Sequence, residues 1–303
     1  MDTNSVLNIE QNDINFTNER LVINKYVKEN FGEVLEEHIS RYAHACKYVK
    51  GKKVLDAACG SGYGSKMIKE AGAEFVIGLD ISDESINNAS VTYGSENIKF
   101  ISGDVNNTGF ENNFFDVVVS YETIEHIDSG KVWIGEASRI LSENGLFIVS
   151  SPNRTVTNHL LKFGDKVRNP YHKFEYTLQE FLGELTTKFD IVDLYGQTFI
   201  PNYVMSSHVT NVRILKYYYT TFVSNTTTSG GGIKRVMQFG KSALKKVFTK
   251  SSNKENYDNK KNKVIVTKPE KIETHKLINL SEIKDMQPMY IIAVCKKKSG
   301  SSF

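Results

Sequence analysis

The sequence has few cysteines and few prolines. Its 303 residues include five prolines and three cysteines, which are Cys46, Cys59 and Cys295. Three scattered cysteines cannot build a disulfide framework, and no CxxC pair that would indicate a zinc site occurs. We therefore expect a protein of a reducing compartment, without a cysteine-based metal site.

Long apolar segments are missing as well. No stretch approaches the roughly 18 consecutive apolar residues that a membrane-spanning helix needs. The first residues, MDTNSVLNIEQNDINF, lack the basic start and the apolar run of a secretion signal. The expectation is a soluble, cytoplasmic protein.

Neither sign of charge dominates the whole chain, but the charge is unevenly distributed. The formal net charge is +3. Residues 201–289 contain sixteen Lys and Arg but six Asp and Glu, a net +10 against −7 for the remainder. Because the whole chain is nearly neutral and shows no nucleic-acid-binding module, we expect no nucleic-acid partner. The charge marks an organisational boundary instead.

Short apolar runs alternate with helical segments in the first two thirds of the chain. A helical, amphipathic leader over residues 33–48 precedes them. The runs, each typical of a strand buried on both faces, are 53–58, 75–80, 98–102, 114–120 and 146–151. Their alternation with helices predicts an α/β fold with a doubly wound parallel sheet and right-handed crossovers.

Two further predicted strands, 188–199 and 290–298, flank the basic stretch. If they pair as a closing hairpin, the basic stretch is an insertion into the sheet. The predicted organisation has four parts. Residues 1–32 are a partly disordered leader and residues 33–200 are the core. Residues 201–289 are a basic insertion, partly disordered over 225–263, and residues 290–303 are the final strand with a tail.

The first predicted strand runs into a glycine-rich turn, VLDAACGSGYGS, with Gly60, Gly62 and Gly64. Glycine allows a sharp turn and close approach of a ligand, and the following helix offers free N–H groups to an anion. The spacing is GxGxG, and Ser65 stands where a dinucleotide-binding turn has Gly or Ala. Asp56 would repel a pyrophosphate and attract a cation. The turn therefore disfavours a nicotinamide cofactor.

Acidic residues also follow the next two strands. Asp80 lies twenty residues beyond Gly60, where a carboxylate can accept both hydroxyls of a ribose. Asp104, in the GDV segment, can accept an adenine amino group. Each of these acids alone could be a helix N-cap or a turn former. Their occurrence at successive strand ends predicts a nucleoside-binding edge.

The ordered segments DAACGSGYG, GLDIS, GDV, YETIEHI and LFIVSSPN resemble the motifs of class I S-adenosylmethionine (SAM)-dependent methyltransferases, over roughly residues 38–200. The resemblance implies SAM as cofactor and a seven-stranded sheet in the order 3-2-1-4-5-7-6, with only the seventh strand antiparallel. The leader helix, which carries an HxxRY pattern, would cover the cofactor, with Arg41 or Tyr42 at its carboxylate. The implied cofactor-binding residues are Tyr42, Asp56, Ala57, Gly60, Gly62, Asp80, Ile81, Asp104, Val105 and Tyr121.

The YETIEHI segment follows the fourth strand and carries Glu122, Glu125 and His126. It is similar to the ExxEH pattern of ubiquinone-biosynthesis O-methyltransferases, for which base catalysis or a divalent metal is considered. In the alternative interpretation, Glu125 binds backbone N–H groups or a lysine, and His126 packs under the cofactor. We predict Glu125 and His126 as catalytic residues and no metal.

A loop after the fifth strand contains NPYHKFEY, with His172, Glu175 and Tyr176, and is preceded by His159. It resembles an NPxHxxEY segment of methyltransferases from bacterial surface-glycan and sugar-modification clusters. We predict His172 as a third catalytic residue. In the alternative, Thr177 and Glu180 form a helix capping box and His172 packs beside it.

The basic stretch includes IKRVMQFGKSALKKVF, residues 233–248, which has the pattern of an amphipathic helix. Such a helix could contact an anionic membrane or a phosphorylated substrate, or simply pack on the domain with a solvated basic face. The predicted function is methyl transfer to a hydroxyl of a sugar, sugar nucleotide or lipid-linked glycan. The alternatives are a phenolic or quinone-type O-methyltransferase and a non-catalytic SAM-binding partner protein. Sequence does not indicate the oligomeric state.

Overall fold

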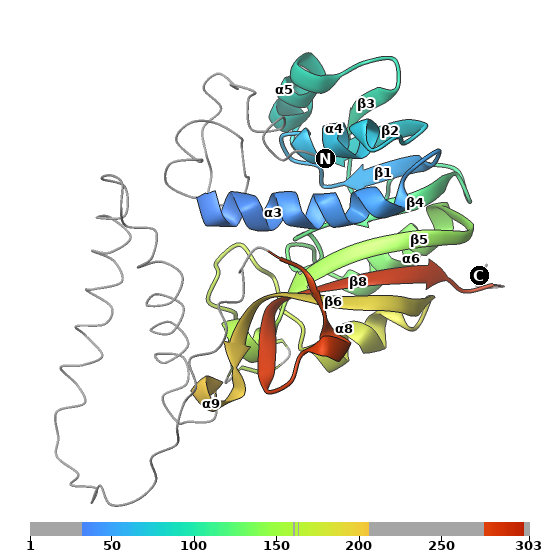
Figure 1. Cartoon of the computed structure of the whole chain (residues 1–303). Coiled ribbons are helices and arrows are strands. Elements are labelled where there is room, and N and C mark those ends of the chain that lie inside the picture. The colour runs from blue at the N-terminus through green and yellow to red at the C-terminus, as the bar shows by residue number, and fades with distance from the viewer. Residues whose placement is uncertain (1–31, 160, 163, 206–275, 300–303) are drawn as a thin grey trace, which may run out of the picture.

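The structure is a computed structural model that describes residues 32–159, 161–162, 164–205 and 276–299. Strands and helices alternate along its first half (Figure 1). The elements up to the fourth strand are α3 Gly32–Ala45, η1 Cys46–Tyr48, β1 Lys53–Ala57, α4 Tyr63–Glu70, β2 Phe75–Asp80, α5 Asp83–Tyr93, β3 Ile98–Ser102 and β4 Phe115–Ser120. The later elements are α6 Gly130–Ile140, β5 Leu141–Pro152, α7 Arg154–Thr157, α8 Leu178–Leu185, β6 Phe189–Pro201, α9 Asn202–Met205, β7 Ile278–Asn279, η4 Leu280–Glu282 and β8 Met286–Lys297.

These strands form one sheet in the order β3-β2-β1-β4-β5-β8-β6-β7. Strands β1 to β5 pair in parallel, whereas β8 runs antiparallel to both β5 and β6. The doubly wound α/β fold is confirmed, and so is the predicted order for the seven strands that were expected, with β8 as the seventh.

The predicted count of seven strands was one too low. Strand β7 adds an antiparallel edge to β6, through the pairs Tyr195–Asn279 and Gly196–Ile278. A two-residue strand has too few residues to show a period-two pattern, so the sequence could not reveal it. Strand β8 also begins four residues earlier than the predicted 290, because Met286 to Pro288 pair with the end of β6.

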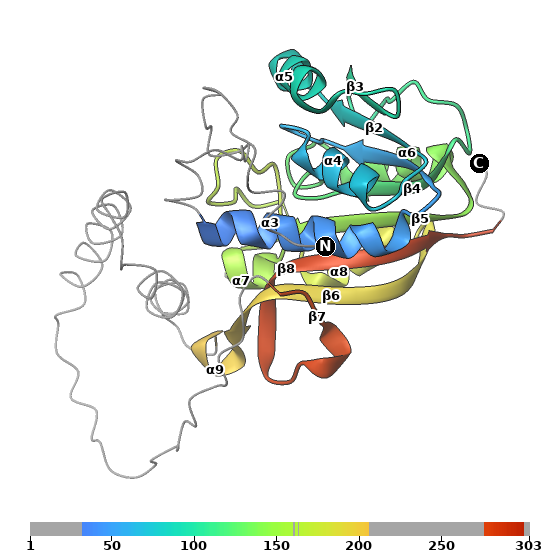
Figure 2. The same cartoon turned by 45° about the horizontal axis from the view of Figure 1, so that its top comes forward.

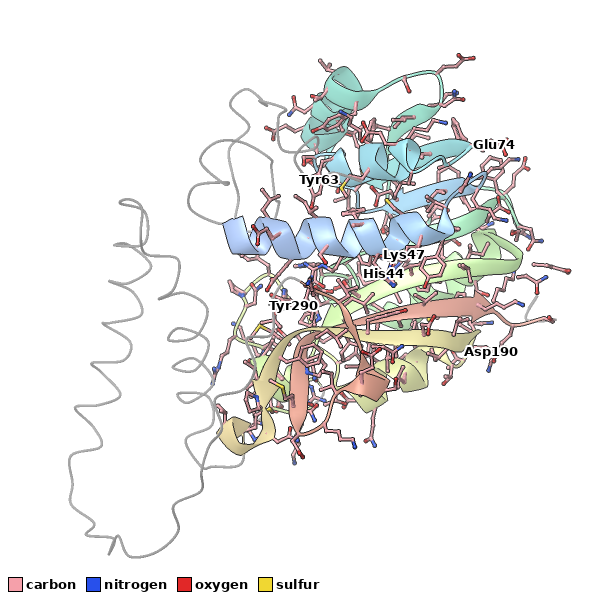
Figure 3. The ribbon with its side chains drawn as sticks, viewed as in Figure 1. His44, Lys47, Tyr63, Glu74, Asp190 and Tyr290 are labelled. Carbon is pink, nitrogen blue, oxygen red and sulfur yellow. The ribbon has the colours of Figure 1, made fainter. Side chains whose placement is uncertain are left out.

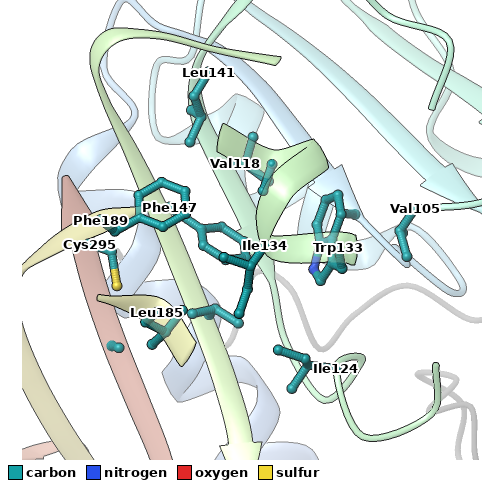
Figure 4. Packing of buried hydrophobic residues seen from close by; sticks show 14 of the residues in the cluster. Val105, Val118, Ile124, Trp133, Ile134, Leu141, Phe147, Leu185, Phe189 and Cys295 are labelled. Carbon is teal, nitrogen blue, oxygen red and sulfur yellow. The ribbon is translucent and has the colours of Figure 1, made fainter. Parts of the chain in front are cut away.

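Helices cover both faces of the sheet, and each face has its own apolar core (Figure 2). On one face, Trp133 and Ile134 of α6 pack with Phe181 of α8 and with strand residues that include Phe147 (Figure 4). On the other face, Leu35 and other residues of α3 pack with α4 and with Tyr93 of α5. Strands buried on both faces, such as β2 and β4, explain most of the continuous apolar runs. The prediction that 98–102 is buried on both faces was wrong, because β3 lies at the edge of the sheet and most of its residues are exposed.

Helix α3 is anchored to the last strands by buried polar contacts. The Arg41 guanidinium donates to Gln197 Oε1 over 3.0 Å and lies 4.9 Å from the Tyr290 ring centroid, beneath α3 in Figure 3. Gln197 Nε2 donates to the Glu37 carbonyl over 3.0 Å. His44, also labelled in Figure 3, packs its ring 4.3 Å from that of Tyr195. These contacts hold α3 across the sheet. They also bind the Arg41 guanidinium to protein groups, so its predicted contact with the cofactor carboxylate stays a prediction.

In the part of the chain that the structure describes, no helix is both long enough and apolar enough to cross a membrane.

Candidate active site

The glycine-rich turn leaves β1 through residues with positive φ, which are Ala58 (60°), Gly60 (54°) and Gly62 (82°). A Cβ on Gly60 would meet no atom within 4 Å, so this backbone borders open space. A Cβ on Gly62 would lie 2.7 Å from the Ala89 Cβ and 2.8 Å from the Phe100 ring. Gly60 is therefore the glycine placed to face a ligand, and Gly62 is needed for packing of the turn.

Asp56 lies buried at the end of β1, beneath this turn. Its two carboxylate oxygens accept hydrogen bonds from the Tyr42 hydroxyl, over 3.0 Å, and from Ser65 Oγ, over 2.6 Å. Burial raises the pKa of Asp56 to about 6, although both hydrogen bonds oppose the shift. The Asp56 carboxylate thus links α3, β1 and α4. The predicted contact of Asp56 with the cofactor stays a prediction. Ala57, beside it, is buried.

This raised pKa predicts a pH-dependent stability. The folded protein holds the Asp56 proton more tightly than the unfolded chain, whose pKa is near the ordinary 3.8, so the free energy of unfolding falls as pH rises from about 4 to about 6. At about 1.4 kcal/mol per pK unit the loss from this group is about 3 kcal/mol. Urea unfolding at several pH values should show a flatter decline for Asp56→Asn than for the wild type. Parallel profiles would contradict the assignment.

Asp80 ends β2 and holds the turn from the other side. Its Oδ2 accepts from the Gly60 backbone N–H and its Oδ1 from that of Ser82, both over 2.9 Å. The next residue, Ile81, is an apolar side chain that is 72% exposed at the sheet edge. A carboxylate beside an exposed apolar side chain suits a ribose with an attached base.

The third strand end contributes Asp104 and Val105. Asp104 is exposed, and its Oδ1 accepts from the backbone N–H and the side-chain amide of Asn106, over 2.8 and 3.1 Å. Val105 is buried in the core next to it. The two residues lie at the same edge as Asp80, because Gly103 N–H bonds the Asp80 carbonyl over 3.0 Å. Together with the open Gly60 backbone and Ile81, this edge fits the nucleoside half of SAM.

Three tyrosine rings meet next to the turn. Tyr42 lies 5.5 Å from Tyr63 and 5.3 Å from Tyr121, between ring centroids. The Tyr121 hydroxyl donates to the Arg41 carbonyl over 2.9 Å. A Cβ on Gly64 would lie 2.1 Å from the Tyr42 ring, so this glycine is needed for α3 to approach α4. Tyr42 and Tyr121, both predicted to bind cofactor, are thus brought together beside Asp56.

The three predicted catalytic residues also come together. One carboxylate oxygen of Glu125 and one ring nitrogen each of His126 and His172 all lie within 4.8 Å of one another. The two imidazole rings meet edge to face, with centroids 4.8 Å apart. Because Glu125 follows β4 and His172 follows β5, two neighbouring strands deliver this cluster to the same edge as Asp80.

Glu122, which the sequence grouped with this cluster, points elsewhere. Its Oε1 accepts from Ser150 Oγ over 2.6 Å and lies 3.8 Å from the Arg41 guanidinium. Its backbone, at φ 49°, turns the chain sharply after β4. Glu122 is thus bound to β5 and α3, and His172 takes the third place in the cluster.

A buried network orients His172. Its Nδ1 bonds Glu175 Oε1 over 2.8 Å, and no other described residue bonds its Nε2. Glu175 Oε2 accepts from Asn158 Nδ2 over 2.8 Å and from the Thr157 hydroxyl. Burial would raise the pKa of Glu175, but the hydrogen bonds from His172, Thr157 and Asn158 outweigh it and lower the pKa. An ionised Glu175 therefore holds the imidazole with Nδ1 as donor and Nε2 as acceptor.

Arg154, which sequence reasoning missed, secures this loop. Its Nε donates to the Glu175 carbonyl over 3.0 Å, and its other nitrogens bind the Leu161 carbonyl and the Glu180 carboxylate. Glu180 also completes a capping box with Thr177 at the start of α8. The capping box is confirmed, and it coexists with the His172–Glu175 pair. The HxxE spacing could have indicated that pair, whereas a single arginine offers no such signal.

The side chain of Glu125 is fully buried, and its Oε1 lies 3.9 Å from His126 Nε2. No hydrogen bond joins its carboxylate to a lysine among the described residues, and both interpretations of its role stay predictions. It is the main-chain carbonyl of Glu125 that accepts from Lys173 N–H, over 2.7 Å. Of the other candidates in the loop, His159 bonds the Thr155 carbonyl over 3.1 Å, and Tyr176 is buried in the core.

The predicted basic helix over 233–248 and the segment 225–263 lie outside the described residues, as does most of the leader 1–32.

Comparisons with known proteins agree with this geometry. Residues 55–149 match the model of a methyltransferase domain. A "probable S-adenosylmethionine-dependent methyltransferase" of Mycolicibacterium smegmatis is 32% identical over 157 residues, which are 52% of this chain and 58% of that protein. A ubiquinone biosynthesis O-methyltransferase of Azorhizobium caulinodans is 26% identical over 181 residues, covering 56% of this chain and 71% of that protein. The chain thus spans little more than half of the mycobacterial relative.

Solved structures support the fold. A SAM-dependent methyltransferase from Mesorhizobium loti aligns with a TM-score of 0.53 at 13% identity, covering 86% of this chain and all of that one. The YcgJ protein of Bacillus subtilis aligns with a TM-score of 0.52 at 16% identity, over 87% of this chain and all of that one. The glycine turn, the acidic strand ends and the family match agree. Residues 55–149 therefore match a methyltransferase domain, the solved structures share the fold of the chain, and the named relatives indicate S-adenosylmethionine as the cofactor.

Proposed function

We propose that this protein transfers the methyl group of SAM to a hydroxyl oxygen of a small polar acceptor, with His172 as the proton acceptor. The observation that carries the proposal is the His172–Glu175 pair, held over 2.8 Å at the sheet edge that also presents the glycine turn and Asp80. A hydroxyl must lose its proton as its oxygen attacks, and an imidazole with an oriented carboxylate is suited to accept it.

When bound, SAM supplies a sulfonium methyl group that a nucleophile can displace in line. The protein's own residues have three tasks in such a transfer, which are alignment, exclusion of water and removal of the acceptor proton. As the acceptor oxygen displaced the methyl group from the sulfur of a bound SAM, its hydroxyl proton would move to His172 Nε2. The ionised Glu175 stabilises the resulting imidazolium through Nδ1. Arg154 keeps Glu175 in place by binding its carbonyl.

The acceptor that we favour is a sugar, a sugar nucleotide or a lipid-linked glycan. The loop NPYHKFEY, which resembles a segment of glycan-modifying methyltransferases, supplies both His172 and Glu175. The net +10 of residues 201–289 suits recognition of a phosphate on such an acceptor. A contact of this stretch with an anionic membrane, and a cytoplasmic location, remain predictions.

A phenolic or quinone-type acceptor is the second candidate. It is supported by the name of the Azorhizobium relative, a ubiquinone biosynthesis O-methyltransferase, and by the ExxEH pattern of Glu122, Glu125 and His126. Both candidates share hydroxyl methylation. A non-catalytic SAM-binding role is less well supported, because the His172–Glu175 pair is assembled in full.

The test is transfer of radiolabelled methyl from SAM to a panel of glycosides, nucleotide sugars and phenols, with mass spectrometry of the products. We expect an O-methyl product from at least one hydroxyl class, formed in proportion to S-adenosylhomocysteine. Products methylated only on nitrogen or carbon would contradict hydroxyl transfer. SAM binding without transfer to any acceptor in the panel would favour the non-catalytic role.

A further inference from the structure

Glu125, His126 and His172 together offer the ligand atoms of a transition-metal site. One carboxylate oxygen of the first and one ring nitrogen of each histidine lie within 4.8 Å of one another. Ligand atoms around a tetrahedral zinc ion lie roughly 3.4 Å apart, because zinc–nitrogen and zinc–oxygen bonds are about 2.1 Å long. A movement of about 1 Å by each side chain would therefore bring these ligand atoms to a single ion.

Both histidines are oriented as metal-binding histidines usually are. His172 Nδ1 bonds the Glu175 carboxylate over 2.8 Å, and His126 Nδ1 bonds the Tyr171 carbonyl over 3.1 Å. A carbonyl oxygen only accepts, so His126 carries a proton on Nδ1 and, when neutral, a lone pair on Nε2. An oxygen partner of this kind fixes the tautomer and makes the other ring nitrogen a better ligand. In each imidazole, Nε2 is therefore the atom prepared to bind a metal.

Glu125 supplies the third ligand and the negative charge. Its side chain is 0% exposed, and no other side chain among the described residues donates a hydrogen bond to it. Its Oε1 lies 3.9 Å from His126 Nε2, which is too long for a hydrogen bond but near the separation of two ligands on one ion. The side chains of His126 and His172 are 30% and 14% exposed, so an ion can enter from the imidazole side.

The donor atoms indicate which ion the cluster would bind. Two imidazole nitrogens with one carboxylate oxygen suit zinc, whereas magnesium prefers oxygen ligands. Two histidines, one glutamate and an open position for water form the coordination of several zinc enzymes. Glu122, the other acid of this segment, is held elsewhere, because its Oε1 accepts from Ser150 Oγ over 2.6 Å. Zinc bound by Glu125 and the two histidines therefore fits the cluster best.

We infer that Glu125, His126 and His172 bind a Zn²⁺ ion, and that the bound ion switches methyl transfer off because it occupies His172 Nε2. The switch rests on the proposed function, in which the same nitrogen accepts the proton of the acceptor hydroxyl. One lone pair cannot bind the ion and the proton at once, so metal binding and proton uptake compete. The active form of the enzyme is then the metal-free one.

Isothermal titration with zinc chloride, after a chelator has removed bound metals, measures the site directly. We expect one ion per chain in the wild type, and binding weaker by at least about tenfold in Glu125→Gln and in His126→Gln. Glu122→Gln is the matched control, because it makes the same chemical change in the same segment, and it should bind zinc like the wild type. Magnesium chloride should not bind at this site. Thermal melting without zinc reports the folding of each variant.

Transfer rates measured with and without zinc test the switch. Saturating zinc should lower the wild-type kcat by about a hundredfold or more, since loss of a general base has an effect of this size. Addition of a chelator should restore the rate. In His126→Gln the ratio of the two rates should be close to one at the same zinc concentration, whatever the rate of the variant without zinc.

Three results would overturn the inference. Zinc that does not bind, or that binds Glu125→Gln and His126→Gln as tightly as the wild type, would show that the cluster is not the site. Loss of zinc binding in a folded Glu122→Gln would place that acid among the ligands. Faster transfer with zinc than without it would make the ion part of catalysis and contradict the switch.

Failure of the proposed function has a different signature. If no acceptor is methylated with or without zinc, hydroxyl transfer is contradicted, and the switch fails with it. The titration still decides the site in that case, because it requires no acceptor and no turnover.

Discussion

Replacement of Asp80 by alanine is expected to weaken SAM binding by about a hundredfold or more. In the structure its two oxygens already organise the site, because they accept from the backbone N–H groups of Gly60 and Ser82, both over 2.9 Å. In the complex we expect the same carboxylate to accept ribose hydroxyls, and hydrogen bonds to a charged group contribute about 1.5–3 kcal/mol each. The substitution therefore removes ligand contacts and loosens the Gly60 turn together.

Isothermal titration with SAM, S-adenosylhomocysteine and NAD measures this effect. Asp83→Ala is the matched control, because Asp83 lies three residues away, is exposed in the first turn of α5 and has the same charge. We expect the control to bind SAM like the wild type, and neither protein to bind NAD. If Asp80→Ala keeps wild-type affinity for SAM, the nucleoside site does not lie at this strand end.

Replacement of His172 by glutamine is expected to lower kcat by about a hundredfold to ten-thousandfold, the range of general base catalysis. The side chain stays polar and similar in length, but it cannot take up a proton. SAM affinity should not change, because the glycine turn and Asp80 are untouched.

Single-turnover transfer rates, with SAM saturating, measure this effect. Glu175→Gln keeps the shape of the His172 partner but removes its charge, so we expect an intermediate loss of kcat at unchanged SAM affinity. His159→Gln is the matched control, because His159 lies in the same loop but bonds only the Thr155 carbonyl among the contacts found for its ring. A His172→Gln variant with wild-type kcat would exclude His172 as the base.

Much of the fold could be predicted because its signals are local. The runs 75–80 and 98–102 were predicted with the bounds that β2 and β3 have. A buried parallel strand such as β2 is a continuous apolar run, so the chain displays it without reference to distant residues. The extra edge strand β7 and the early start of β8 were missed, because their pairing partners lie about 80 residues away on β6.

Some residues of the candidate site could likewise be predicted from local sequence patterns, and others could not. Gly60, Asp80 and Asp104 stand at strand ends, so the strand pattern and the rule that ligands bind at carboxyl ends suffice to place them at one edge. The capping box of Thr177 and Glu180 was likewise visible, because its two residues are three apart on one helix.

The sequence by itself therefore determined the α/β fold, since that fold depends on the order of local patterns along the chain. The strand order followed from the resemblance to methyltransferases, and the nucleoside edge stays a prediction. Tertiary structure alone decided which acid joins the histidines, because Glu122 turns to Ser150 and Arg41, whereas Glu125 meets His172 from 47 residues away. It also decided that Glu125 is buried beside His126 and that Arg154 secures Glu175. Burial and protonation depend on neighbours that only the folded chain assembles, and no spacing in the sequence encodes them.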